Sequence, residues 1–106
     1  HPVAMIGRDR TLECLTKSVR PGTVLKVDAS STYDPDGDPM TFRWEIYKEP
    51  GTYKGRIQLQ GADLPECSVM IPDDAAGSVI HLVLEVTDSG TPALTSYRRV
   101  IINVLK

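Results

Sequence analysis

A turn followed directly by an alternating segment, at residues 34–48, constrains the fold of this chain more than any other stretch. Residues 34–39 read Asp-Pro-Asp-Gly-Asp-Pro, which favours a tight surface turn because proline restricts φ and aspartate bonds to nearby backbone amides. From residue 40 onward apolar and polar residues alternate, and the apolar positions are Met40, Phe42, Trp44 and Ile46. The only tryptophan and the only phenylalanine therefore share one face, which predicts a half-buried strand that packs against a second layer.

Further short segments separated by turn residues predict an all-β fold. The expected strands cover residues 11–19, 23–29, 40–48, 56–60, 67–71, 79–87 and 96–105, with an edge strand or entry segment in residues 1–10. This pattern is typical of an immunoglobulin-like antiparallel β-sandwich of about seven strands, in which a tryptophan on the third strand packs across the core.

Three local expectations complete this prediction. The Pro21-Gly22 turn predicts that residues 11–19 and 23–29 form a hairpin. The most hydrophobic segment, residues 79–87, is expected to be a central strand. Residues 73–77 are expected to be a loop, because one turn before a glycine cannot sustain a helix alone.

Length and charge indicate one globular domain without a nucleic-acid or membrane role. The 106 residues suffice for a single domain, residues 1–106, with its own core. The net charge of −2, with interspersed signs, offers no basic stripe for nucleic acid, and no apolar run is long enough for membrane insertion. Because the start His1-Pro2-Val3 lacks a charged leader segment, we expect a domain excised from a longer chain.

Cys14 and Cys67 are the two cysteines of the chain. They show no Cys-x-x-Cys spacing and no histidine cluster accompanies them, which argues against a zinc site. Two interpretations stay open, a disulfide between them or two small buried thiols.

The acidic turn contains a candidate calcium site. Its three aspartates at alternate positions, with Glu45 further on, superficially match an EF-hand loop. That loop requires a glycine at its sixth position, where this chain has Pro39, and the following strand carries Glu45 away from the turn. The candidate ligands of another kind of calcium site are Asp34, Asp36, Asp38 and Asp88. The alternative is that these carboxylates bond to turn amides.

Outward-facing residues of three expected strands form a candidate ligand-binding face. The candidate ligand-binding residues are Arg43, Tyr47, Tyr53, Tyr97 and Arg99. Other polar residues expected on or beside this face are Glu45, Lys54, His81, Glu85 and Asn103. Tyrosine rings can stack on sugars while charged side chains bond to hydroxyl groups, so this face could bind a glycan. The alternatives are a docking surface for a neighbouring domain and a solvated face of cross-strand charge pairs.

No catalytic residue is expected. His81 is the only internal histidine, and the sequence contains no Gly-x-Ser-x-Gly elbow. Glu45 and Glu85 are expected on an open sheet face, where water solvates both carboxylates. A structural or surface role for His81 is expected.

Several motifs resemble known families of sandwich domains. Residues 28–38, Phe42-Arg43-Trp44 and Val86-Thr87-Asp88 resemble polycystic-kidney-disease-type and cadherin-like domains. A closer resemblance is to the C-terminal domain of bacterial cellulose-binding proteins that carry an N-terminal nucleoside-hydrolase-like domain. That resemblance rests on His1-Pro2, Arg43-Trp44, residues 49–55, residues 72–77 and residues 84–99.

The resemblance implies a noncatalytic accessory domain of an exported bacterial protein, located outside the cell or in the periplasm. Its expected partners are the N-terminal nucleoside-hydrolase-like domain of the same chain and a polysaccharide such as cellulose. No cofactor is expected apart from the calcium considered above. The alternative function is a calcium-stabilised structural spacer or adhesion module.

Overall fold

The computed structural model describes residues 15–29, 39–47, 52–53, 55–89 and 95–106. Within them the chain forms the strands β1 (Leu15–Val19), β2 (Val24–Asp28), β3 (Met40–Tyr47), β4 (Gln58–Gln60), β5 (Glu66–Met70), β6 (Val79–Asp88) and β7 (Thr95–Val104), and the 3-10 helix η1 (Asp73–Ala75). The expected edge strand in residues 1–10 lies outside this described part.

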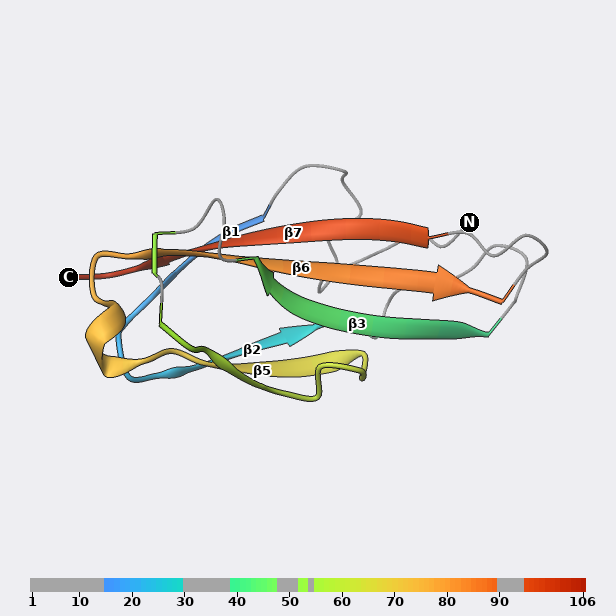
Figure 1. The fold of residues 1–106 in the computed structure, drawn as a ribbon, viewed down its shortest axis with the longest axis horizontal. Helices are drawn as coiled ribbons and strands as arrows, with labels where there is room; N and C mark the ends of the chain where they lie inside the picture. Colours follow the sequence, from blue (N-terminus) through green and yellow to red (C-terminus); the bar gives the residue numbers. More distant parts are fainter. Residues whose placement is uncertain (1–14, 30–38, 48–51, 54, 90–94) are drawn as a thin grey trace.

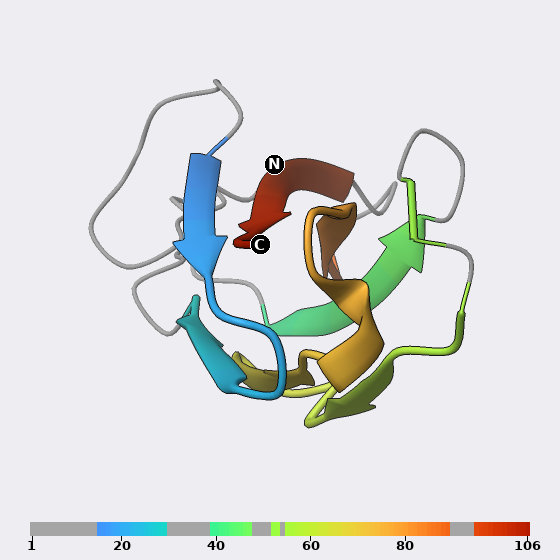
Figure 2. The same cartoon turned by 90° about the vertical axis from the view of Figure 1, so that its left-hand side faces the viewer.

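Two sheets pack face to face. One has the strand order β1-β7-β6-β3 and the other β2-β5-β4 (Figure 1). Figure 2 looks along the strands and shows the two layers around the core, with η1 between them at one end. The all-β sandwich is therefore confirmed, and the strand orders β2-β5-β4 and β7-β6-β3 match the B-E-D and G-F-C orders of immunoglobulin sandwiches. As expected, β6 is central, because it lies between β7 and β3.

The predicted hairpin of residues 11–19 and 23–29 is wrong. The strand β1 pairs in parallel with β7, and β2 pairs antiparallel with β5 in the other sheet. After the turn, the Gly22 amide donates to the Ile71 carbonyl at 3.0 Å and the Ile71 amide donates to Thr23 at 2.9 Å. The turn thus carries the chain from one sheet to the other. The apolar residues of β1 and β2 then pack on the same core from opposite layers.

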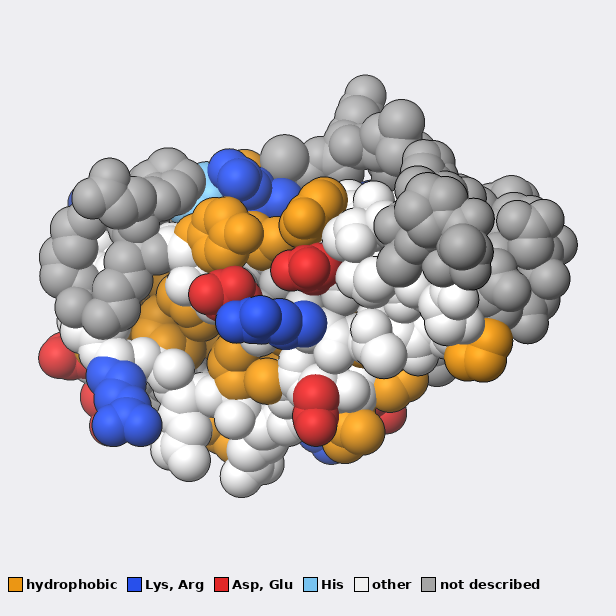
Figure 3. Space-filling model, turned by 45° about the vertical axis from the view of Figure 1, so that its right-hand side comes forward, with side chains coloured by type: hydrophobic (Ala, Val, Ile, Leu, Met, Phe, Trp, Pro, Cys, Tyr) orange, Lys and Arg blue, Asp and Glu red, His pale blue; other side chains and the backbone are white. Residues whose placement is uncertain are grey.

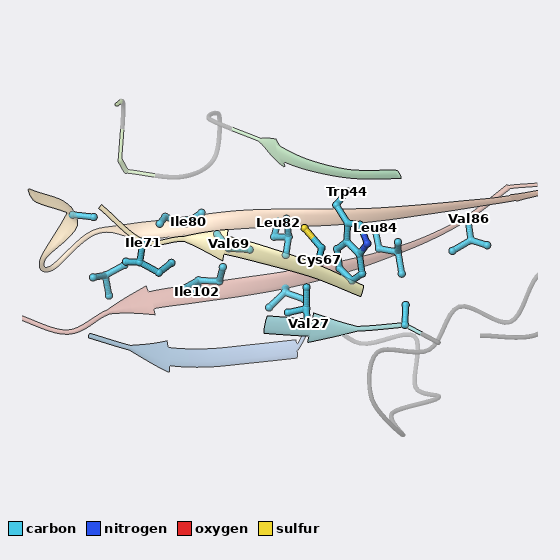
Figure 4. Packing of buried hydrophobic residues seen from close by; sticks show 14 residues of the cluster. Val27, Trp44, Cys67, Val69, Ile71, Ile80, Leu82, Leu84, Val86 and Ile102 are labelled. Atoms are coloured by element: carbon cyan, nitrogen blue, oxygen red, sulfur yellow. The ribbon is translucent and has the colours of Figure 1, made fainter. Parts of the chain in front are cut away.

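The core follows from the alternation of apolar residues. Every second residue of β6 and β7 faces the other sheet, and Leu82, Leu84, Val100 and Ile102 have no exposed surface. The complete buried cluster comprises Val27, Ala29, Trp44, Cys67, Val69, Ile71, Ala75, Ile80, Leu82, Leu84, Val86, Val100, Ile102 and Val104. Figure 4 shows Trp44 beside Leu84, with Cys67 and Leu82 next along the core. Burial of this apolar surface is the main force that holds the layers together.

The structure changes one local expectation, at residues 73–75, and decides between the two interpretations of Cys67. Residues 73–75 form a 3-10 turn instead of the expected loop, and Ala75, with no exposed surface, packs into the core. Tertiary burial thus stabilises a turn too short to persist alone. Cys67 is a free, fully buried thiol, so the disulfide alternative is not realised.

In the described ranges no helix has the length and apolarity needed to cross a membrane.

Candidate functional site

The outward-facing residues of β3, β6 and β7 form one continuous surface, named here the β3–β6–β7 face. Cross-strand pairing arranges it in four rows: Tyr47, His81 and Ile101; Glu45, Val83 and Arg99; Arg43, Glu85 and Tyr97; and Thr41, Thr87 and Thr95. Residues directly opposite each other on antiparallel strands have Cβ atoms about 5 Å apart, so each row is a line of neighbouring side chains.

Four of the five predicted ligand-binding residues lie on this face. Tyr47 and Tyr97 are 37% and 59% exposed, and they occupy opposite corners of the first three rows. Arg43 occupies a third corner, on β3, and Arg99 lies on β7 between Tyr97 and Ile101. The tyrosine rings are thus accessible to a ligand, whereas Trp44, on the inner side of β3, is only 2% exposed.

Charges of opposite sign alternate across the face. Arg43 Nη2 lies 3.9 Å from Glu45 Oε2 on the same strand, and Glu85 lies directly opposite Arg43 on β6. The side chains of Arg43 and Glu45 are 69% and 48% exposed, so water screens this pair and its contribution to stability is small. Figure 3 shows acidic and basic side chains side by side, with hydrophobic ones among them. Accessible guanidinium and carboxylate groups can donate to and accept from the hydroxyl groups of a ligand.

His81 lies in the row between Tyr47 and Ile101. Burial lowers its pKa below the ordinary value of 6.5, and the nearby positive charge of Arg99 lowers the pKa further. Its Nδ1 atom is buried and has no hydrogen-bond partner within the described ranges. These observations indicate a neutral imidazole near pH 7.

Tyr53, the fifth predicted ligand-binding residue, is not brought onto the face. Its ring packs against the core cluster, and its hydroxyl donates to Asp74 Oδ1 at 2.7 Å. This hydrogen bond is the largest cause of a raised Tyr53 pKa, followed by burial and by the Asp74 charge. Tyr53 therefore connects the 52–53 segment to η1. Lys54, which was expected beside the face, lies outside the described residues.

Asp88, the last of the four candidate calcium ligands, ends β6 opposite Met40 and is 6% exposed. The next amide, that of Ser89, donates to the Pro39 carbonyl at 3.1 Å. Asp88 is thereby held beside the point where the acidic turn enters β3. The other three candidates, Asp34, Asp36 and Asp38, lie outside the described residues, and among those described no three acidic, histidine or cysteine side chains gather as a metal group.

Two features of the face go beyond what alternation along the strands indicates. Val83, at its centre, is only 6% exposed. The threonine row is joined by a Thr87 Oγ1 to Thr95 Oγ1 contact of 3.0 Å and a bond of 3.4 Å from Thr41 Oγ1 to the Thr87 carbonyl. Alternation assigns Thr41 and Thr87 to the face, since they lie two residues from Arg43 and Glu85, but it does not indicate the contacts among the threonines.

Comparisons with known proteins agree on one group. The family described as cellulose-binding protein Sde0182, C-terminal domain, matches residues 24–104. A solved structure of a nucleoside hydrolase-related hypothetical protein from Saccharophagus degradans, described as associated with carbohydrate metabolism, superposes with a TM-score of 0.96 at 36% sequence identity. The match covers 98% of this chain and 25% of that one, so this chain spans about a quarter of the length of that protein. The comparison with curated proteins finds no match.

Proposed function

This chain belongs to the family of the cellulose-binding protein Sde0182 C-terminal domain, and from that premise we propose that it is a noncatalytic accessory module that binds polysaccharide through the β3–β6–β7 face. The observation that carries the proposal is the presence of two accessible tyrosine rings, Tyr47 and Tyr97, on an open sheet face among arginine and glutamate side chains. Tyrosine buries apolar surface and keeps a hydroxyl for hydrogen bonding, which suits the apolar faces and polar rims of sugar rings.

The relative that shares this fold supports a wider setting for the module. That protein is about four times as long as the matched region and is described as nucleoside hydrolase-related. We propose that this chain likewise accompanies an N-terminal nucleoside-hydrolase-like domain and works outside the cell or in the periplasm, where polysaccharide is available.

Retention on polysaccharide tests the proposed function. The chain is mixed with washed amorphous cellulose, whose chains are individually accessible, and, separately, run through native gels that contain soluble polysaccharides. The unaltered chain should be retained, and a Tyr47→Ala/Tyr97→Ala double variant should lose most of that retention. Lys26→Ala, on the outer side of β2 in the other sheet, is the matched surface control and should behave as the unaltered chain. Equal retention of all three proteins, or of none, would refute the proposal.

Docking of the neighbouring domain on the same face is the second candidate, favoured by the length of the relative and by the 59% exposure of Tyr97 in this chain alone. A separately produced N-terminal domain should then slow hydrogen exchange in β3 and β7, and the double variant should lose this protection. Unchanged exchange would remove this candidate.

The alternative function is a calcium-stabilised spacer or adhesion module, and it rests on the contact that holds Asp88 beside the acidic turn. Carboxylate oxygens are the ligands that calcium prefers. Calcium at millimolar concentration should then raise the melting temperature of the chain, and Asp88→Asn should reduce that rise. An identical melting temperature with calcium and with a chelator would exclude this alternative.

A further inference from the structure

We infer that the β3–β6–β7 face accommodates a single chain of a neutral glycan, extended from Tyr47 to Tyr97, in preference to a crystalline surface or an acidic polysaccharide. The inference rests on the proposed carbohydrate-binding function and specifies its ligand class. Its evidence is the spacing of the two tyrosines, the balance of charge between them and the burial of the tryptophan.

The spacing requires a ligand of several sugar units. Tyr47 lies opposite His81, which lies opposite Ile101, and Tyr97 precedes Ile101 by four residues on β7. Two strand spacings and four residues along a strand place the tyrosine Cα atoms roughly 17 Å apart on the diagonal. One sugar ring cannot contact both side chains, whereas an extended chain that crosses the strands obliquely can.

The charges that flank this diagonal cancel. Arg43 and Arg99 contribute two positive charges, and Glu45 and Glu85 contribute two negative ones. His81 adds none near neutral pH because burial lowers its pKa. A polyanionic glycan would gain from the arginines but be repelled by the glutamates between them, so the face gives it no net attraction. Hydroxyl groups of a neutral glycan can pair with both kinds of side chain.

The same side chains disfavour a flat crystalline surface. Such a surface would cover Arg43, Glu45 and Glu85 together and remove their water, while its packed chains expose few hydroxyls in positions that replace it. Removing water from charged side chains is costly even where an ion pair such as Arg43–Glu45 remains, and this cost offsets the contacts of two tyrosines. Trp44, which could have added a third aromatic platform, is in the core with 2% of its surface exposed. A single chain can instead orient its hydroxyl groups toward each charged side chain.

Calorimetric titration with soluble ligands tests the inference. Cellohexaose should bind, cellobiose should bind at least about tenfold more weakly, and binding should change less than about twofold between about 50 and about 500 mM sodium chloride. Tyr47→Ala and Tyr97→Ala should each weaken cellohexaose binding about tenfold. Lys26→Ala should leave it unchanged.

Three outcomes overturn the inference. Retention on crystalline cellulose without affinity for cellohexaose, or tighter and salt-sensitive binding of polygalacturonate, would refute the ligand class while the proposed carbohydrate-binding function stands. Equal affinity for cellobiose and cellohexaose would refute the extended path between the tyrosines. Failure to bind any of these carbohydrates would instead refute the proposed function on which the inference rests.

Discussion

The indole Nε1 of Trp44 donates a hydrogen bond to the backbone carbonyl of Leu64 at 2.8 Å. The backbone amide of Trp44 also donates, to the Ala62 carbonyl at 2.7 Å. Trp44 belongs to β3 in the four-stranded sheet, whereas residues 61–65 connect β4 and β5 in the other sheet. One buried residue therefore contributes apolar packing between the layers and two hydrogen bonds that join them.

Replacing Trp44 should reveal this double contribution. Trp44→Phe removes the indole donor, leaves the Leu64 carbonyl without its partner and opens a small cavity, so the free energy of unfolding should fall by about 2–4 kcal/mol. Urea unfolding followed by circular dichroism measures the change. Ile46→Val, a partly buried position on the same side of β3, is the control and should lose about 1 kcal/mol. Equal losses for the two variants would contradict the role of the hydrogen bond.

Two glycines with left-handed backbone form a matched pair for a second prediction. Gly61 has φ of +80°, and a Cβ placed there would lie 2.6 Å from the Glu66 carbonyl oxygen. Gly77 has φ of +77°, but its Cβ would meet only the Lys106 side chain, at 3.4 Å. Gly77→Ala should cost about 1–2 kcal/mol from backbone strain, and Gly61→Ala should cost more because a backbone atom must also move. Thermal melting of both variants measures the difference, and an equal loss would contradict the close approach.

The lowered pKa of His81 predicts a loss of stability on acidification. Because the imidazole is buried near Arg99, the folded state releases its proton more readily than the unfolded state, whose pKa is about 6.5. Between the folded pKa and 6.5 the unfolded state binds more protons, so stability falls as pH drops through this window and is unaffected by His81 above it. His81→Gln should flatten this part of the profile, as measured by melting temperature from pH 8 to about pH 5. His1 is present in both proteins and cancels in the comparison. Parallel profiles would contradict the prediction.

Cys67 should be unreactive in the folded protein. Burial raises the pKa of this thiol to about 11, and the side chain has no exposed surface, so neither thiolate nor access is available near pH 8. In a Cys14→Ser background, iodoacetamide should label Cys67 only at the rate of unfolding and rapidly in urea. Mass spectrometry follows the labelling. Fast modification of the folded chain would contradict the buried position.

Much of the fold could be predicted from local pattern. Alternation along residues 40–48, 79–87 and 96–105 correctly indicated which side chains face the core, because neighbouring residues on a strand point to opposite faces whatever strand lies beside them. The same alternation brought Arg43, Tyr47, Tyr97 and Arg99 to one face.

Other features depend on contacts distant in sequence. The pairing of β1 with β7 could not be predicted, because the Pro-Gly turn sets the local direction of the chain and does not specify which strand lies beside β1. Likewise, η1 persists because Ala75 is buried by the rest of the chain.

The sequence by itself determined the all-β class, the inward faces of the strands and the candidate face, since each follows from the two-residue period of a strand and from burial of apolar side chains. Only the tertiary structure decided which strands are neighbours, that Tyr53 bonds to Asp74 instead of joining the face, and that Trp44 bridges the sheets through Leu64. Those choices are made by hydrogen-bond partners and packing surfaces far apart along the chain, and no local pattern encodes which of them meet.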